Sequence, residues 1–260
     1  MTVAIGLVCS DGVVVASDSM ASMGTTARPI CKVFAQPELQ MVWTASGSVY
    51  VIEEVAQVIA DSVKVSNVKA SCHAPDPNGI RTTLAPKVTA AMKKCYESAL
   101  PFGLNQAVNG QHHPFISDFL LLGWSKSKPW FMEIDNQGQL NWHTDAQFAA
   151  VGSGGAFATV AQALMRHYVE GRPVNVDDGL LVAYRAIETT CGVSSSSVGL
   201  PVWLATSTDK GARVLKREEI DEVDAAVQAW KQLEIETLID LRAPAHGEKD
   251  EAPEAPPSLA

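Results

Sequence analysis

Thr2, which follows Met1, is a candidate for nucleophilic chemistry because of its place in the chain. A small second residue normally permits removal of the initiator methionine, which would leave Thr2 with a side-chain hydroxyl and a free α-amine. A free α-amine titrates near pH ~8 and can therefore accept the hydroxyl proton at neutral pH. This is the threonine/N-terminal-amine form of nucleophile activation. A threonine in second position carries little weight by itself, so the rest of the chain must supply the context.

A glycine-rich run, VGSGG at residues 151–155, is the second feature with a chemical interpretation. Between a strand and a helix, such a turn can hold a phosphate on its backbone N–H groups. The full GxGxxG spacing and the acidic residue that should follow it are absent, so a tight turn is the simpler interpretation. The chain has no P-loop, HExxH, GxSxG or EF-hand pattern. Its six histidines and five cysteines lack ligand spacing, so we expect neither a metal nor a cofactor.

Composition narrows the class of protein. The 260 residues are 47% hydrophobic and 19% charged, as in ordinary globular proteins, and the formal charge is −9. An acidic chain is a poor partner for nucleic acid or for anionic membranes. No apolar run approaches the ~20 residues of a membrane span, and the first residues lack the pattern of a signal peptide. We therefore expect a cytoplasmic protein with reduced thiols.

The pattern of apolar residues predicts the elements that would position Thr2. The turn at residues 10–12 (SDG) predicts a hairpin between two β-branched runs. A helix is predicted to begin near Ser48, another at 87–100, a pair within 156–190 and one at 217–241, with loops at 67–87 and 101–117. The second helix of the pair is predicted to be capped by Asn175, with Asp178 three residues further on. The predicted strands cover residues 3–9, 13–18, 32–35, 41–46, 119–124, 130–134, 139–143, 148–151, 200–206 and 212–215.

The order of these elements indicates the fold class. Strands come in adjacent antiparallel pairs and helices also come in pairs, which fits two packed sheets with helices outside. We therefore expect an α+β fold, a four-layer αββα sandwich, over residues 1–243. Strict alternation of strand and helix is absent, which argues against a Rossmann sheet or a TIM barrel. Residues 244–260 are rich in proline and acidic side chains and are predicted to form a disordered tail.

Several segments together resemble the proteasome-type β subunits, a branch of the N-terminal-nucleophile hydrolases. The resemblance begins with TVAIGLVCSDGVVVASD at 2–18 and continues at Gly24, at Lys32 and at TASG of 44–47. It extends through 130–158 and 176–187, and SVGLP at 197–201 is similar to a stretch of the Anbu proteins. The likeness covers about residues 2–240, apart from the middle, and is nearest to bacterial proteasome-like proteins of the Anbu and HslV type.

By position, the resemblance implies that Thr2 is the nucleophile and that its α-amine is the base. Lys32 would lie beside the Thr2 hydroxyl, where its ammonium favours the developing alkoxide. Asp18 would keep Lys32 charged and oriented. The backbone N–H of Gly47 would donate to the tetrahedral oxyanion. Taken singly, Asp18 and Lys32 are better explained by a simple ion pair.

Two serines complete the site that the resemblance implies. Ser153 and Ser197 would form hydrogen bonds around the Thr2 amine, although alone they are explained as a helix N-cap and a turn residue. The chain also departs from the family. The Asp usually found three residues before Ser197 is Ser194 here, and the Arg often found two residues after Asp18 is Met20. These departures leave the proton relay of the amine open.

The activity expected is that of a threonine-type endopeptidase that cleaves peptide bonds through an acyl-enzyme on Thr2 after removal of Met1. The resemblance implies a polypeptide substrate and a homo-oligomeric ring or helical stack, with helices 156–190 and 217–241 as candidate interfaces. An ATP-dependent unfoldase is a candidate partner, whereas nucleic acid and membranes are not. Two alternatives stay open: a non-catalytic scaffold subunit of the same fold, and an amidase that acts on small amides through Thr2.

Overall fold

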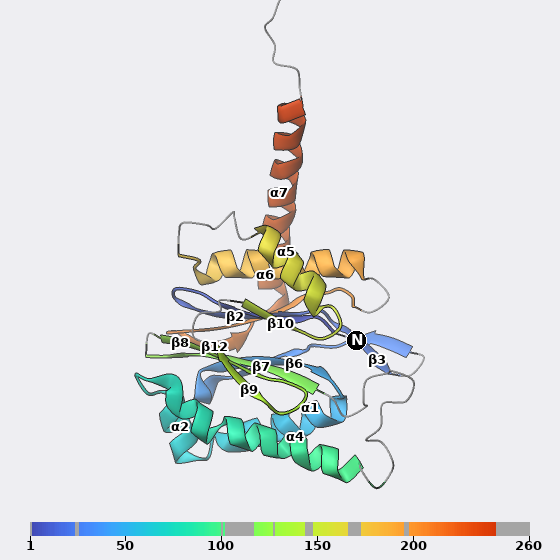
Figure 1. The fold of residues 1–260 in the computed structure, drawn as a ribbon. Coiled ribbons are helices and arrows are strands. Elements are labelled where there is room, and N and C mark those ends of the chain that lie inside the picture. The colour runs from blue at the N-terminus through green and yellow to red at the C-terminus, as the bar shows by residue number, and fades with distance from the viewer. Residues whose placement is uncertain are drawn as a thin grey trace, which may run out of the picture.

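A computed structural model describes residues 2–23, 26–99, 101, 117–126, 128–143, 148–165, 173–194 and 198–242 of the chain. The two large sheets have five strands each and pack face to face, with helices covering both outer surfaces (Figure 1). The predicted αββα sandwich is confirmed. The predicted tail at 244–260, Ser197 and most of the predicted loop at 101–117 lie outside the described residues.

The first sheet carries the N-terminal segment near its centre. Its strand order is β10 (Phe148–Val151), β1 (Ala4–Val8), β2 (Gly12–Ser17), β11 (Trp203–Thr208) and β12 (Gly211–Val214). β1 and β2 form the hairpin that the Asp-Gly turn predicts, with Ala4 opposite Ser17. On its other side β1 pairs with β10, so that Ala4 lies opposite Val151. This register brings the glycine-rich turn after β10 next to Thr2.

The second sheet has the order β5 (Val33–Gln36), β6 (Met41–Gly47), β7 (Ser117–Ser125), β8 (Lys128–Ile134) and β9 (Leu140–His143). Every pairing in it is antiparallel. Apolar side chains of the two sheets meet in a common core that includes Val13, Val42, Leu120 and Phe131. The two predicted strands at 32–35 and 41–46 are confirmed as β5 and β6.

Helices form the outer layers. The first sheet is covered by α5 (Gly155–Met165), α6 (Val176–Val193) and the body-facing part of α7 (Arg217–Arg242), whose remainder projects away (Figure 1). The second sheet is covered by α1 (Val49–Ser62), α2 (Ser66–Cys72), α3 (Ile80–Thr83) and α4 (Ala85–Ala99). Asn175 caps α6 by accepting a hydrogen bond from the Asp178 N–H at 2.8 Å, as predicted. No helix among the described residues is long and apolar enough to span a bilayer.

Two segments differ from the sequence-based expectation. Residues 67–87, predicted to be a loop, contain most of α2, a 3-10 turn at Pro77–Gly79 and α3. The prolines do not prevent this, because Pro77 and Pro86 stand in the first turn of the 3-10 helix and of α4, where the missing N–H costs nothing. The connection from 18 to 32 also contains a hairpin, β3 (Met20–Met23) and β4 (Thr26–Pro29). Strands of four residues are too short to show a clear period.

Candidate active site

Thr2 lies at the start of β1 and is held through its backbone on both sides. Its carbonyl oxygen accepts a hydrogen bond from the Gly154 N–H at 3.1 Å. The next residue, Val3, exchanges two hydrogen bonds with Asp18, because its N–H donates to Oδ1 at 3.1 Å and its carbonyl accepts from the Asp18 N–H at 3.1 Å. Only 9% of Thr2 is exposed. The position of its hydroxyl is therefore fixed by the sheet and by the turn after β10.

Lys32 brings a buried amine to the Thr2 hydroxyl. Its Nζ lies 3.1 Å from Thr2 Oγ1 and 2.8 Å from Asp18 Oδ1, and it also donates to the carbonyl of Met20. Burial lowers the pKa of Lys32 below its ordinary value, and the neighbouring Asp18 carboxylate opposes this effect. An ammonium at hydrogen-bonding distance favours the alkoxide form of the hydroxyl. The arrangement is suited to activating Thr2 Oγ1 as a nucleophile.

Asp18 is wholly buried and uses both carboxylate oxygens. Oδ1 accepts from Lys32 and from the Val3 N–H, and Oδ2 accepts from the N–H groups of Met20 at 3.0 Å and Gly199 at 3.2 Å. These four bonds occupy about as many acceptor positions as an ionised carboxylate offers. Asp18 therefore ties together β1, β5 and the segment before β11, and it orients Lys32.

The turn at residues 151–155 wraps around the Thr2 backbone, as a tight turn rather than a phosphate loop. Gly152 has φ +88°, and a Cβ added to it would lie 2.3 Å from the Thr2 carbonyl oxygen and 3.1 Å from Cβ of Ser46. Only glycine fits this conformation and this close approach. Ser46 therefore lies beside Thr2, which brings the adjacent Gly47 at the end of β6 to the same place.

Five of the six predicted site residues lie in the described part of the structure. Thr2, Asp18 and Lys32 are brought together by direct hydrogen bonds. Ser153 lies beside Thr2, but the contact that its Oγ makes, at 3.5 Å, is with the Thr2 carbonyl oxygen. Gly47 adopts φ +114° at the junction of β6 and α1. Ser197 lies outside the residues that the structure describes, so its place is not part of this geometry.

Sequence reasoning missed three groups near Thr2. The Met20 carbonyl and the Gly199 N–H contact Lys32 and Asp18 through their backbone, which no side-chain pattern reveals. Cys191 of α6 is the third. Burial and the charge of Asp18 raise the pKa of its thiol to about 12, while Lys32 lowers it, which places the sulfur near the ion pair. A single cysteine in a sequence does not indicate that its sulfur lies near an ion pair in the structure.

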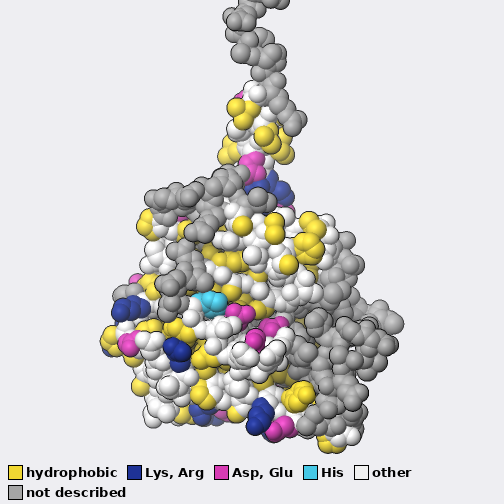
Figure 2. All heavy atoms as spheres, in the orientation of Figure 1, with side chains coloured by type: hydrophobic (Ala, Val, Ile, Leu, Met, Phe, Trp, Pro, Cys, Tyr) yellow, Lys and Arg dark blue, Asp and Glu magenta, His cyan; other side chains and the backbone are white. Residues whose placement is uncertain are grey.

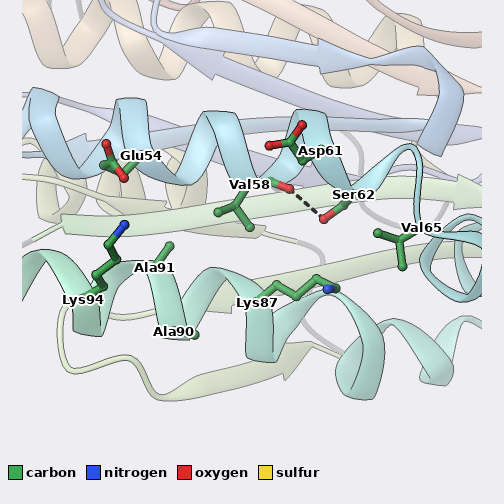
Figure 3. A pocket seen from close by; sticks show the side chains of 9 residues that line it. All are labelled: Glu54, Val58, Asp61, Ser62, Val65, Lys87, Ala90, Ala91 and Lys94. Carbon is green, nitrogen blue, oxygen red and sulfur yellow. Dashed lines mark hydrogen bonds between the residues drawn. The ribbon is translucent and has the colours of Figure 1, made fainter.

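A hollow of about 400 Å³ lies elsewhere, between α1 and α4 on the outer face of the second sheet (Figure 3). Glu54 and Asp61 line it from α1, and Lys87 and Lys94 line it from α4. The hydroxyl of Ser62 donates to the Val58 carbonyl of its own helix at 2.7 Å. The second sheet separates this hollow from β1, so it is not part of the Thr2 site.

Comparison with known proteins identifies the relatives of this chain. No protein-family model matches it. Proteasome subunit beta 1 of Thermococcus onnurineus is 28% identical over 222 residues, which cover 85% of this chain and 95% of the relative. Proteasome subunit beta of Methanohalophilus mahii is 26% identical over 224 residues, covering 85% of this chain and 93% of the relative.

Two solved structures show the same fold. Anbu from Yersinia bercovieri has a TM-score of 0.65 and 16% identity, covering 95% of this chain and 99% of its own. An Anbu mutant from Hyphomicrobium sp. strain MC1 has a TM-score of 0.64 and 17% identity, covering 93% and 99%. The chain is thus a homologue of the proteasome-type β subunits and shares the fold of the bacterial Anbu proteins.

Proposed function

We propose that this protein is a threonine-type endopeptidase in which Thr2, exposed by removal of Met1, attacks the carbonyl carbon of a peptide bond. One observation carries the proposal. Lys32 Nζ lies 3.1 Å from Thr2 Oγ1 and is held there by Asp18, in a buried setting. A structural ion pair would need no hydroxyl beside it, and a hydroxyl with a structural role would need no ammonium.

The reaction follows the usual steps of acyl transfer. The Thr2 α-amine takes the hydroxyl proton as Oγ1 forms a bond to the substrate carbonyl carbon. The oxygen of the tetrahedral intermediate accepts a hydrogen bond from the Gly47 N–H. The intermediate collapses, the C–N bond breaks, and the protonated amine gives its proton to the leaving amine. Water then hydrolyses the ester on Thr2, with the α-amine again as base.

The two serines and the assembly belong to the same proposal. We assign Ser153 and Ser197 to the hydrogen bonds that orient the α-amine, on the resemblance and, for Ser153, on its place beside Thr2. We expect a polypeptide substrate, delivered to a homo-oligomeric ring or stack, with an ATP-dependent unfoldase as a candidate partner. All five cysteines are free thiols, which suits the reducing cytoplasm.

Exposed apolar side chains on α5 and α7 support self-assembly. α5 contains no charged residue and exposes Phe157 and Val160. Figure 2 shows hydrophobic side chains gathered on the projecting part of α7. These side chains are Leu233, Ile235, Leu238, Ile239 and Leu241. Two different apolar surfaces on one chain suit a repeating contact between subunits. Such a contact either closes into a ring or continues as a helical stack of subunits.

The test combines intact mass with labelling by a threonine-directed peptide electrophile. We expect the purified protein to lack Met1 and to be labelled at Thr2, the Thr2→Ala variant to be unlabelled, and Thr2→Ser to keep a reduced rate. Labelling that persists in Thr2→Ala would show that Thr2 is not the nucleophile. Retention of Met1 would favour the scaffold alternative. Hydrolysis of small acyl-amides in preference to fluorogenic peptides would favour the amidase.

A further inference from the structure

Two successive residues of β7 hold the junction between β6 and α1, where Gly47 lies. In the antiparallel register Gly47 is opposite Ser117, and Ser46 is opposite Asp118. Successive side chains of a strand point to opposite faces of the sheet. Ser117 and Asp118 therefore reach the junction from opposite sides, one from the helical layer and one from the space between the sheets.

The following residues of β7 identify the two faces. Phe119 and Leu121 lie on the same face of β7 as Ser117 and pack in the core beneath the helices of the second sheet. Leu120 and Leu122 lie on the same face as Asp118 and pack in the core between the two sheets. Thr2 directly precedes the first sheet, whose strand β1 begins at Ala4, so Asp118 lies on the side of the junction that faces Thr2.

Ser117 fixes the residue that follows Gly47. Its Oγ accepts a hydrogen bond from the Ser48 N–H at 3.0 Å, and its side chain is buried. Ser48 is the N-cap of α1, but its own side chain makes no capping hydrogen bond. The entry into α1 is thus tied to β7 through the serine hydroxyl of a different strand.

Asp118 fixes the residue that precedes Gly47. Its Oδ2 accepts a hydrogen bond from Ser46 Oγ at 3.2 Å, and its Oδ1 accepts from the Asn136 N–H at 3.0 Å. Asn136 lies in the turn after β8, so the carboxylate is braced against a second element. Burial raises the pKa of Asp118 above its ordinary value, although the bonds from Ser46 and Asn136 oppose the shift. The two hydrogen bonds give the carboxylate a defined orientation in which it holds Ser46.

We infer that Ser117 and Asp118 are positioning residues that aim the Gly47 N–H at the oxyanion, an inference that rests on the proposed function. Gly47 has φ +114°, a conformation in which glycine has unusual freedom, so its peptide plane needs external restraint. An oxyanion donor is effective only at 2.7–3.1 Å from the oxygen that carries the charge, as a general rule. The two hydrogen bonds on either side of Gly47 supply that restraint.

The test separates oxyanion binding from ordinary peptide binding. A peptide aldehyde forms a hemiacetal when Thr2 Oγ1 adds to its carbonyl carbon and the carbonyl oxygen takes up a proton, so its oxygen occupies the oxyanion position. A peptide amide of the same sequence binds without that tetrahedral oxygen. The variants are Ser117→Ala, Asp118→Ala and the milder Asp118→Asn. Ser125→Ala is the control, because Ser125 is a buried serine at the other end of β7, with its hydroxyl bonded to the Ala74 carbonyl.

We expect the Ser117 and Asp118 alanine variants to bind the aldehyde about 10- to 100-fold more weakly and to lose kcat by a similar factor, since complete loss of an oxyanion donor costs ~100-fold or more. KM and the Kd of the peptide amide should stay within about 2-fold, and Ser125→Ala should match the wild type. Asp118→Asn should recover part of the loss, because its amide oxygen still accepts a hydrogen bond.

Three outcomes separate the inference from the proposed function. Equal weakening of aldehyde and amide binding would reduce Ser117 and Asp118 to a structural role and overturn the inference. Unchanged aldehyde binding in folded variants would overturn it as well. If the wild type does not bind the aldehyde, or if Thr2→Ala binds it equally well, the proposed function fails instead. Thermal unfolding of each variant shows which of them are folded.

Discussion

Lys32 and Asp18 form an ion pair inside the protein, with 2.8 Å between Nζ and Oδ1 and only 8% and 0% of their side chains exposed. Each charged group has further hydrogen-bond partners, so the desolvation of both ions is offset by the surrounding structure. Both the stability of the fold and the chemistry proposed for Thr2 depend on this pair.

Replacement of Asp18 by Asn should destabilise the fold strongly. The change leaves the Lys32 ammonium buried without its counter-ion, which typically costs about 3–5 kcal/mol in the free energy of unfolding. Asp221→Asn is the matched control, because Asp221 pairs with Arg217 at 2.8 Å on an exposed helix surface. That variant should lose less than about 1 kcal/mol. Denaturant unfolding measures the free energy of unfolding of both variants. Equal losses would show that the buried pair contributes no more to stability than the exposed one.

The lowered pKa of Lys32 predicts an alkaline limit to the reactivity of Thr2. The ammonium is lost at lower pH than in a solvated lysine, so the labelling rate should begin to fall below pH ~10.4. Unfolding does not explain such a fall. Between the folded and the unfolded pKa the unfolded state binds more protons, so the free energy of unfolding that Lys32 contributes rises with pH.

The variant Lys32→Arg separates this effect from other titrations. Arginine keeps its charge over the whole accessible range, so the alkaline fall should disappear, whatever the residual rate. The measurement is the labelling rate of Thr2 against pH, with circular dichroism at each pH to show that the protein is folded. The same alkaline fall in Lys32→Arg would assign the titration to a different group.

Gly152→Ala should displace Thr2. The new Cβ would lie 2.3 Å from the Thr2 carbonyl oxygen, and φ +88° is strained for alanine. Small misplacements of reacting groups are costly, so the labelling rate should fall about 100-fold. Gly192→Ala is the control, since Gly192 is a helical glycine with no atom near its added Cβ. It should leave the rate unchanged and stabilise the fold by ~0.5–1 kcal/mol. A Gly152→Ala variant with wild-type reactivity would contradict the close approach.

A polar substitution in the projecting part of α7 should impair assembly without impairing folding. Leu238→Ser removes one exposed apolar side chain from that part, and the proposed oligomer should shift to smaller species in size-exclusion chromatography with light scattering. Glu222→Ser, an exposed polar position nearer the body on the same helix, should leave the assembly unchanged. An identical profile for both variants would remove α7 from the interface.

Local patterns in the sequence predicted much of the fold. The Asp-Gly turn predicted the β1–β2 hairpin, Asn175 with Asp178 predicted the start of α6, and the strand pairs predicted the two sheets. The short hairpin at Met20–Pro29 was missed, because its strands are too brief for a period. α2 was missed because the prolines that follow it suggested a loop throughout.

Less of the candidate site than of the fold could be predicted from the sequence. Thr2 was predicted from its chemistry, whereas Asp18 and Lys32 were connected to it only through the resemblance. Neighbours that act through the backbone, such as the Gly199 N–H, are invisible in a sequence, since they depend on which distant segments fold together. The same holds for Ser117 and Asp118, whose importance appears only in the register of β6 with β7.

The span of the Asp18 hydrogen bonds has a consequence for biosynthesis. Asp18 and Gly199 are 181 positions apart, and Thr2 is held by a turn about 150 residues away, at Ser153 and Gly154. A chain that is still emerging from the ribosome has its first residues but neither of these partners. Thr2 and Asp18 therefore lack these hydrogen bonds until the segments around Gly154 and Gly199 have been synthesised. The long reach of these contacts delays the assembly of the site, and with it the activity proposed for Thr2, until the subunit has folded.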